Sequence, residues 1–183
     1  MNKEDKTCFV IIGYGQKTDY KTGRLLDLTK SYDNLIKPVL DELDIKGFRG
    51  IDKNYENSGF IDTDMYGYLL KSDLVIADVS TNNPNAIYEL GIRHALRPFS
   101  TIIICEEGTE IPFDFGRNVI ETYQHLGVDV GVSEAERFKE LLSNKIKYIL
   151  GKKNVDSPVY TMFPDLAPPS FSKKELHKIM DKE

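Results

Sequence analysis

The stretch from Asp73 to Leu96 constrains the fold more than any other part of this 183-residue chain. It opens with a short, continuous apolar block, Leu74 to Ala77, of the kind that forms a strand buried on both faces. In the polar turn that follows, Asn83 is placed to cap a helix, and Pro84 to take its first position, where a missing N–H costs nothing. The stretch therefore predicts a buried strand, a polar turn and a helix.

The expected helix has one apolar face. Small and apolar residues recur there at helical spacing, which predicts that this face packs against a sheet. Gly91 would allow a close approach between the helix and that sheet. The face consists of Ile87, Leu90, Gly91, His94 and Ala95.

Two carboxylates flank the polar turn. Ligands of open α/β sheets bind outside the carboxyl ends of the strands, and Asp78 lies at such an end. Glu89 follows in the first two turns of the helix, where the helix dipole favours an ionised acid. We expect both on the rim of one pocket, with Asn82, Asn83 and Asn85 as neutral hydrogen-bonding groups between them. Taken singly, the Asp also fits a cap and the Glu also fits a residue that compensates the dipole.

Residues 77–96, ADVSTNNPNAIYELGIRHAL, resemble the signature of the nucleoside 2-deoxyribosyltransferase-like proteins and their relatives among bacterial TIR-like proteins. In that group a strand, a polar loop and a helix bearing Tyr/Phe-Glu-Leu-Gly form the active site. The resemblance extends over residues 8 to about 150. It implies that Glu89 is the catalytic carboxylate.

A second acid precedes this stretch. Deoxyribosyltransferases carry an aspartate at about this distance before the glutamate, and it helps to hold and protonate the nucleoside. The resemblance implies that Asp64, which fits the offset better than Asp62, has this role. Taken alone, either acid is explained as a first-turn residue of the helix expected over residues 61–71.

A glycine turn follows the first strand signal, in residues 8–12. The turn, Gly13-Tyr14-Gly15, could cradle a phosphate or sugar or be a simple turn, because the dinucleotide fingerprint and the P-loop are both absent. Members of the group often carry Pro-Phe-Gly here, so the resemblance implies that Gly13, Tyr14 and Gly15 line the substrate pocket. Residues 16–29, long and polar, indicate a mobile flap or an ordinary surface loop.

Five strand signals alternate with helical patterns. Because parallel strands need helical crossovers, this alternation predicts a three-layer flavodoxin-like α/β fold with a five-stranded parallel sheet. A helix from Ser31 must kink or break at Pro38 unless this proline lies near the helix start, and the last helix runs from Ser133 to Gly151. The strand signals lie in residues 8–12, 46–51, 74–77, 101–105 and 119–123.

The chain divides into one domain, residues 1–152, and a short C-terminal extension, residues 153–183. Four prolines in the extension work against regular structure, and a short charged helix is expected over residues 172–182. This arm could wrap a neighbouring subunit or be a loosely packed terminus. Its prolines are Pro158, Pro164, Pro168 and Pro169.

Composition excludes several functions. A net charge of −5 and a pI near 5.3 argue against nucleic-acid binding, which needs a basic surface. No apolar run is long enough to cross a bilayer and the start lacks a signal-type core, so we expect no membrane association and a cytoplasmic location. Cys8 and Cys105 lie in apolar runs without ligand spacing, which predicts buried thiols and no metal site.

Acids without a metal, a cysteine nucleophile or a Ser/His pair suit cleavage at an anomeric carbon, where a carboxylate stabilises or traps the oxocarbenium-like state. We therefore expect cleavage or transfer at the N-glycosidic bond of a nucleoside or nucleotide. Glu89 would act as nucleophile or cation stabiliser, while Asp64 or Asp78 positions the sugar. The TIR-like branch implies cleavage or cyclisation of NAD as substrate, often in antiviral defence. The deoxyribosyltransferase branch implies base exchange, and neither implies a bound cofactor.

A non-catalytic nucleotide sensor or assembly module that uses the same pocket is the alternative. Arg93 and Arg117, if they lie near the pocket, would favour ligands that carry phosphate. Relatives usually build their pockets at subunit interfaces, so the resemblance also implies a homo-oligomer.

Overall fold

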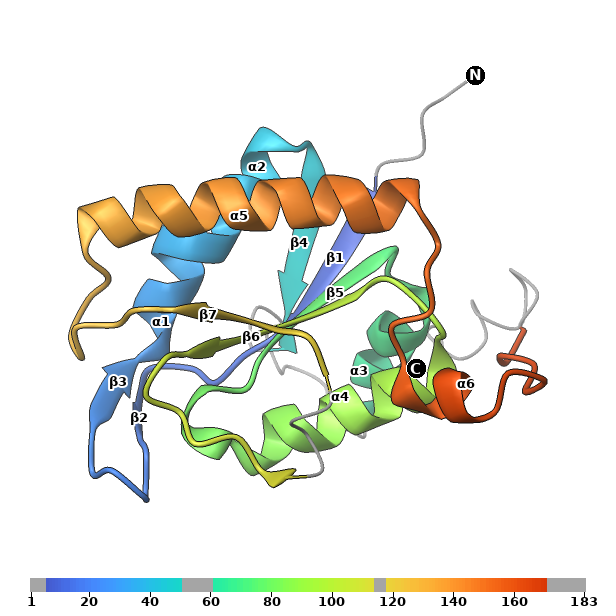
Figure 1. The fold of residues 1–183 in the computed structure, drawn as a ribbon, viewed down its shortest axis with the longest axis horizontal. Coiled ribbons are helices and arrows are strands. Elements are labelled where there is room, and N and C mark those ends of the chain that lie inside the picture. The colour runs from blue at the N-terminus through green and yellow to red at the C-terminus, as the bar shows by residue number, and fades with distance from the viewer. Residues whose placement is uncertain (1–5, 51–60, 114–117, 171–183) are drawn as a thin grey trace.

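The protein is built on a five-stranded sheet in which all neighbouring strands are parallel, in the order β4-β1-β5-β6-β7 (Figure 1). The computed structural model describes residues 6–50, 61–113 and 118–170, with residues 61–64 described by their backbone alone. This sheet confirms the expected three-layer flavodoxin-like α/β fold. Its strands are β1 (Lys6–Ile11), β4 (Ile45–Arg49), β5 (Leu74–Asp78), β6 (Thr101–Glu106) and β7 (Ile120–Tyr123).

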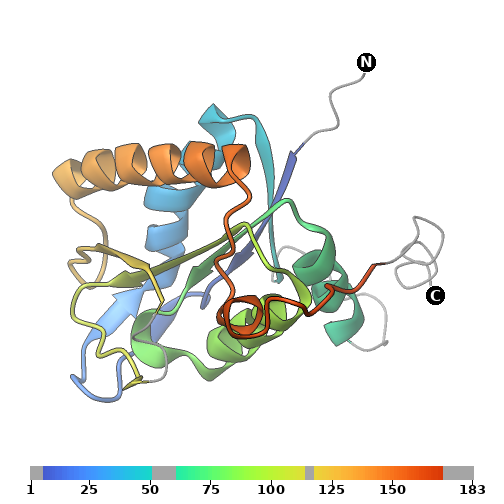
Figure 2. The same cartoon turned by 45° about the vertical axis from the view of Figure 1, so that its right-hand side comes forward.

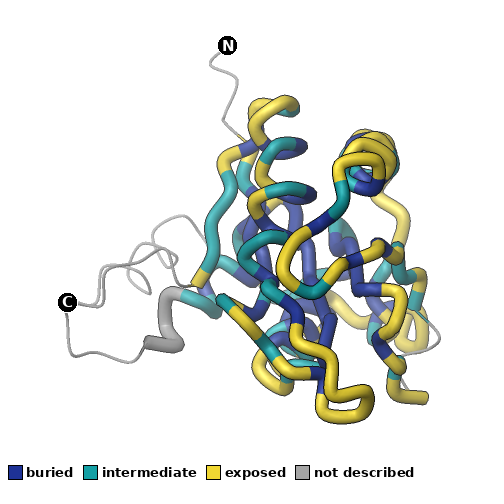
Figure 3. Tube along the Cα trace, turned by 90° about the vertical axis from the view of Figure 1, so that its left-hand side faces the viewer, coloured by how far each residue is buried: buried dark blue, intermediate teal, exposed yellow. Residues whose placement is uncertain are grey.

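Helices cover both faces of the sheet (Figure 2). On one face lie α1 (Leu28–Ser31), η1 (Tyr32–Ile36), α2 (Lys37–Glu42) and α5 (Val132–Gly151). On the other face lie α3 (Ile61–Lys71) and α4 (Pro84–Leu96). The strands between them are buried, whereas the outer faces of the helices are exposed (Figure 3). None of the helices in the described ranges has the length and apolar character to cross a bilayer.

Successive side chains of each strand enter different cores, because a strand has a period of two. In β5 every residue is buried, as expected for a central parallel strand. Leu74 and Ile76 face η1, α2 and α5, while Val75 and Ala77 face α3 and α4. The face that each residue of β5 presents is therefore fixed by its place in the sequence.

A turn of π-helix, η1, precedes Pro38 in the first helical stretch. Proline has no N–H, and its ring collides with the carbonyl one turn earlier, so a regular α-helix cannot pass through it unchanged. The Lys37 N–H bonds to the Tyr32 carbonyl five residues back, and Pro38 then takes an early position of α2. The predicted interruption at Pro38 is confirmed, in the form of a widened turn.

The segment after the glycine turn is an antiparallel hairpin. The Leu28 N–H donates to the Gly15 carbonyl at 3.1 Å, and Arg24 Nη1 lies 2.7 Å from Glu106 Oε1 at the end of β6. The segment is thus anchored to the sheet, unlike the flap or loop that the sequence predicted. The two strands of the hairpin are β2 (Gln16–Thr18) and β3 (Leu25–Asp27).

The buried face of α4 differs from the predicted one. Gly91 and Ala95 are exposed, and a Cβ added at Gly91 would meet no atom within 4 Å, so the predicted close approach is wrong. The buried stripe includes the charged residue Arg93 and so lies on a different side of the helix from the predicted one. A prediction from hydrophobic periodicity leaves a charged residue such as Arg93 out of the buried face. Its members are Ala86, Leu90, Arg93 and His94.

Arg93 is only 1% exposed and joins α4 by hydrogen bonds to the C-terminal end of α3 and to the loop before β6. Its Nη1 donates to the carbonyls of Leu69 (2.7 Å) and Ser72 (3.2 Å), and its Nη2 donates to those of Phe99 (3.1 Å) and Ser100 (3.2 Å). Burial lowers the pKa of Arg93 to about 10, so the group stays charged at neutral pH. Arg93 is therefore a structural residue, and Arg117 lies outside the described residues.

The start of the C-terminal extension packs against α4. The Thr101 N–H donates to Asp156 Oδ2 at 2.9 Å, and Ser157 Oγ donates to the His94 carbonyl at 2.7 Å. Pro158 opens the short helix α6 (Pro158–Met162), so it starts regular structure where the sequence predicted none. The helix expected over residues 172–182 lies outside the described residues.

Two side chains of α5 cover one end of the outer edge of β7. Glu134 Oε1 accepts a hydrogen bond from the Gln124 N–H at 3.0 Å, and Arg137 Nη2 donates to the Thr122 carbonyl at 3.0 Å. One residue of a further parallel strand would make the same pair of bonds. The Glu134–Arg137 ion pair, 2.6 Å long, thus stands in for that residue.

Arg93→Met should lower the free energy of unfolding by about 3–4 kcal/mol, because several buried carbonyls lose a charged donor at once. Urea unfolding at pH 7 measures the change. Lys147→Met, which removes the same charge from an exposed position of α5, is the control and should change stability by less than about 0.5 kcal/mol. Equal stability of the two variants would contradict a structural role for Arg93.

Asp156→Asn tests how the extension responds to pH. Burial raises the pKa of Asp156 from 3.8 to about 6, so the folded state prefers the protonated acid. The resulting stabilisation is present below pH 4 and is lost as the pH rises to about 6. The Asn variant should match the wild type near pH 3.5 and exceed its stability by about 1–2 kcal/mol at pH 7. Urea unfolding of both proteins across this interval measures the difference, and a constant difference would contradict the assignment.

Candidate functional site

The candidate site lies at the carboxyl edge of the sheet, between β1 and β5. The chain leaves β1 towards β4 on one side and returns to β5 on the other, so the strand order reverses between these two strands. Doubly wound sheets bind their ligands in the crevice at such a reversal. The glycine turn follows β1 and the asparagine-rich turn follows β5, which brings both predicted loops to this place.

Gly13 and Asn83 meet at this edge of the sheet. A Cβ added at Gly13 would lie 2.8 Å from Leu28 Cδ1 and 3.2 Å from Asn83 Nδ2, so a larger residue would have to push these side chains aside. Gly15 has a φ of +67°, and its N–H donates to Thr29 Oγ1 at 3.1 Å. Tyr14, between them, is 54% exposed. The structure thus brings the predicted glycine turn against the predicted asparagine turn.

The turn after β5 has a strained backbone. In η3 (Ser80–Asn82), Thr81 has a φ of +61° and Asn82 a φ of +50°. A β-branched residue such as Thr rarely adopts the left-handed region, and each such residue costs about 1–3 kcal/mol. Such strain concentrates at functional sites. Apart from the polar character of the turn, no sequence pattern predicts this strain.

The side chains of the turn have defined roles. Asn83 Oδ1 accepts hydrogen bonds from the N–H groups of Asn85 (3.0 Å) and Ala86 (3.3 Å), which confirms it as the N-cap of α4. Asn82 Nδ2 donates to the Glu110 carbonyl at 3.0 Å, whereas its buried Oδ1 finds no partner among the described residues. The Asn85 side chain is exposed. The amides of Asn82 and Asn83 are therefore held in place at the turn by hydrogen bonds to the main chain.

Glu89 is half-buried in the second turn of α4. It lies one turn before Arg93, whose guanidinium reaches carbonyls at the end of α3, so it shares the side of α4 that faces α3. The two helices are in contact there, with the hydroxyls of Tyr66 and Tyr88 3.1 Å apart. The backbone of Asp64 lies in the first turn of α3, and its side chain lies outside the described residues.

Asp78 is fully buried and does not line a rim. It shares the strand face of Leu74 and Ile76, which is covered by η1, α2 and α5, whereas Glu89 belongs to the helix on the opposite face. The prediction that Asp78 and Glu89 flank one pocket is therefore wrong as far as Asp78 is concerned. Because side chains alternate between the two faces of a strand, Asp78 points to the same face as Leu74 and Ile76.

Asp78 instead holds the start of the strained turn. Its Oδ1 accepts the Ser80 N–H at 2.9 Å, and its Oδ2 accepts the Tyr123 hydroxyl at 2.7 Å. The same hydroxyl lies 2.9 Å from Ser31 Oγ and 3.1 Å from Ser80 Oγ, and Ser80 Oγ accepts the Glu106 N–H at 2.8 Å. Burial raises the pKa of Asp78. We term Ser31, Asp78, Ser80 and Tyr123 the buried network; Tyr123 was not predicted as a site residue.

The two cysteines and His94 are buried and are not candidates for catalysis. Cys8 and Cys105 are free and buried, as predicted, and burial raises the pKa of Cys105 to about 12. Burial likewise lowers the pKa of His94 to about 4, so it is neutral at pH 7. In the described part of the chain, no group of His, Cys, Asp and Glu residues could hold a metal ion.

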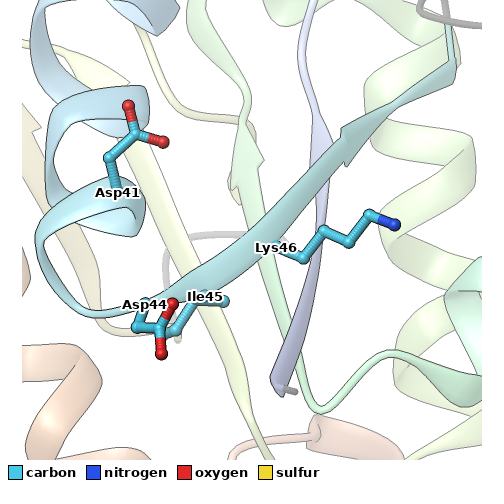
Figure 4. Close-up of a pocket in the computed structure, with 4 residues that line it drawn as sticks. All are labelled: Asp41, Asp44, Ile45 and Lys46. Atoms are coloured by element: carbon cyan, nitrogen blue, oxygen red, sulfur yellow. The ribbon is translucent and has the colours of Figure 1, made fainter.

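A shallow hollow elsewhere on the surface is not part of this site. It lies at the amino end of β4, on the opposite edge of the sheet from the crevice, and is lined by Asp41, Asp44, Ile45 and Lys46 (Figure 4). The Lys46 side chain runs away from both aspartates, and its Nζ lies 5.1 Å from the centre of the Phe48 ring. We assign this hollow no role.

Tyr123→Phe should lower the free energy of unfolding by about 1–3 kcal/mol, because a buried carboxylate oxygen loses its donor. Urea unfolding at pH 7 measures the loss. Tyr148→Phe removes a hydroxyl from a Tyr that is 51% exposed and should leave stability within about 0.5 kcal/mol of the wild type. A Tyr123→Phe protein as stable as this control would show that the buried network holds nothing in place.

Comparison with protein-family models and with curated proteins gave no match for this chain.

Proposed function

We propose that the crevice between β1 and β5 binds a nucleoside or nucleotide, and that the protein cleaves or transfers its N-glycosidic bond. Glu89 stabilises the oxocarbenium-like state or traps it as a glycosyl ester. The observation that carries this proposal is a half-buried carboxylate on the α3-facing side of α4, the helix that follows a strained turn at the reversal of strand order. The resemblance of residues 77–96 to the deoxyribosyltransferase-like and TIR-like proteins supports it.

The chemistry of the neighbouring groups agrees with this choice. The buried thiols and the buried Arg93 guanidinium cannot reach a ligand at this edge of the sheet, so neither is a candidate for the chemistry. Because Asp78 is buried, its part in the reaction is to position the turn through Ser80. Asp64, in the first turn of α3, is then the second acid that we propose for the sugar or the leaving base. Both NAD and deoxynucleosides remain candidate substrates.

We also propose that the protein is a homo-oligomer of a reducing, cytoplasmic compartment. Cys8 and Cys105 are both unpaired, which suits an environment in which disulfides do not persist.

Glu89→Gln tests the proposal. Incubation of the wild type with NAD and with each deoxynucleoside, alone and with a second base, should release or exchange a base, as measured by chromatography. In the variant the rate should fall at least about 10²-fold, because the amide cannot offset the charge of the transition state. Glu140→Gln, an exposed acid on α5, should keep the wild-type rate.

Two results would contradict the catalytic proposal. The first is an unchanged rate in the Glu89→Gln protein. The second is binding without release for every compound at high protein concentration, which would favour a nucleotide sensor.

A further inference from the structure

We infer that Lys17 makes the crevice selective for ligands that carry a phosphate group, such as a nucleotide, over the matching plain nucleoside. The inference rests on the proposed position of the ligand between β1 and β5. It gives that site a specificity-determining residue that the sequence did not single out. Lys17 takes the phosphate-binding role considered for Arg93 in the sequence analysis, because the buried guanidinium of Arg93 is bound to main-chain carbonyls.

The hairpin directs Lys17 towards the body of the protein. Lys17 is the half-buried middle residue of β2, and its neighbours Gln16 and Thr18 are exposed. It is paired in register with Leu26, which is 1% exposed. Because directly opposed residues of an antiparallel pair share one face, Lys17 lies on the inner face of the hairpin.

Lys17 reaches the point where the two site loops meet. A Cβ added at Gly13 would lie 3.3 Å from Lys17 Cγ and 3.2 Å from Asn83 Nδ2. Asn83 uses its Oδ1 as the cap of α4, so its amide turns the donor nitrogen towards Gly13. The stem of Lys17 and an amide N–H thus meet at the glycine turn, and the ammonium lies within one flexible side-chain length of it. Both are hydrogen-bond donors, which suits an anion.

The other cations of the hairpin already have partners. Arg24 Nη1 lies 2.7 Å from Glu106 Oε1, and Lys21 Nζ lies 2.8 Å from Glu110 Oε1. Among the described residues, no carboxylate forms an ion pair with Lys17. Its positive charge is therefore available to a ligand.

The position of Lys17 is fixed on both sides of the hairpin. The Gly15 N–H donates to Thr29 Oγ1 at 3.1 Å, and the Leu28 N–H returns a bond of 3.1 Å to the Gly15 carbonyl. Asp27 N–H donates to the Gly127 carbonyl at 2.8 Å. The hairpin therefore holds the lysine over the turn before a ligand arrives, which lowers the ordering cost of binding.

Calorimetric titration of the Glu89→Gln protein tests the inference without turnover of the ligand. Two matched pairs are compared: nicotinamide mononucleotide with nicotinamide riboside, and 2′-deoxyadenosine 5′-monophosphate with 2′-deoxyadenosine. In at least one pair the phosphorylated compound should bind about tenfold more tightly, as expected for a charge-assisted hydrogen bond. This preference should weaken as salt is raised from about 0.05 to 0.5 M.

Lys17→Met keeps the length of the side chain and removes its charge, so it should abolish the preference. Lys17→Arg should retain it, and Lys21→Met is the matched control, since that lysine is on the same hairpin but is bound to Glu110. A ratio near one in the starting protein, a ratio unchanged by Lys17→Met, or no binding of any of the four compounds would overturn the inference. Failure of base release with the phosphate preference intact would instead overturn only the proposed reaction.

Discussion

The hydrogen bond between Tyr123 and Asp78 is the interaction on which the candidate site depends. It joins β7 to β5 beneath the turn that leads into α4, and Ser31 and Ser80 extend it to α1 and to the turn itself. Each member is buried and bonded, so the network defines one position for the main chain at Ser80. A carboxylate that the sequence suggests for catalysis thus serves to place the residues beside it.

The turn between β5 and α4 is held at both of its ends. The buried network fixes Ser80, and the Asn83 cap fixes the first turn of α4, so Thr81 and Asn82 are confined to left-handed conformations. A backbone of this kind persists only where its surroundings over-determine it. Helix α4 then carries Glu89 away from this fixed point at a defined angle, which is the condition for a preorganised carboxylate.

Local patterns predicted the sheet, the helix beginning at Pro84, and the cap at Asn83, because each rests on residues that are neighbours in sequence. The alternation of side chains from Leu74 onward also indicates the face to which Asp78 points. We nevertheless predicted that Asp78 lines a pocket, because it is a carboxylate at the end of a parallel strand. The buried stripe of α4 was missed because Arg93 finds its partners on other elements. The approach of Lys17 to Gly13 depends on the tertiary placement of a hairpin, and no spacing in the sequence reports it.

The ion pair that closes the edge of β7 has a consequence for the behaviour of the protein in solution. An open strand edge is a template for strand addition, which leads to sheet-to-sheet aggregation. Here side chains of the same chain occupy the Gln124 N–H and the Thr122 carbonyl, so a strand added at this end of β7 would first have to displace them. The bond from Arg137 lowers the pKa of Glu134 below its usual value, so the ion pair itself favours the charged form of the acid that holds this edge.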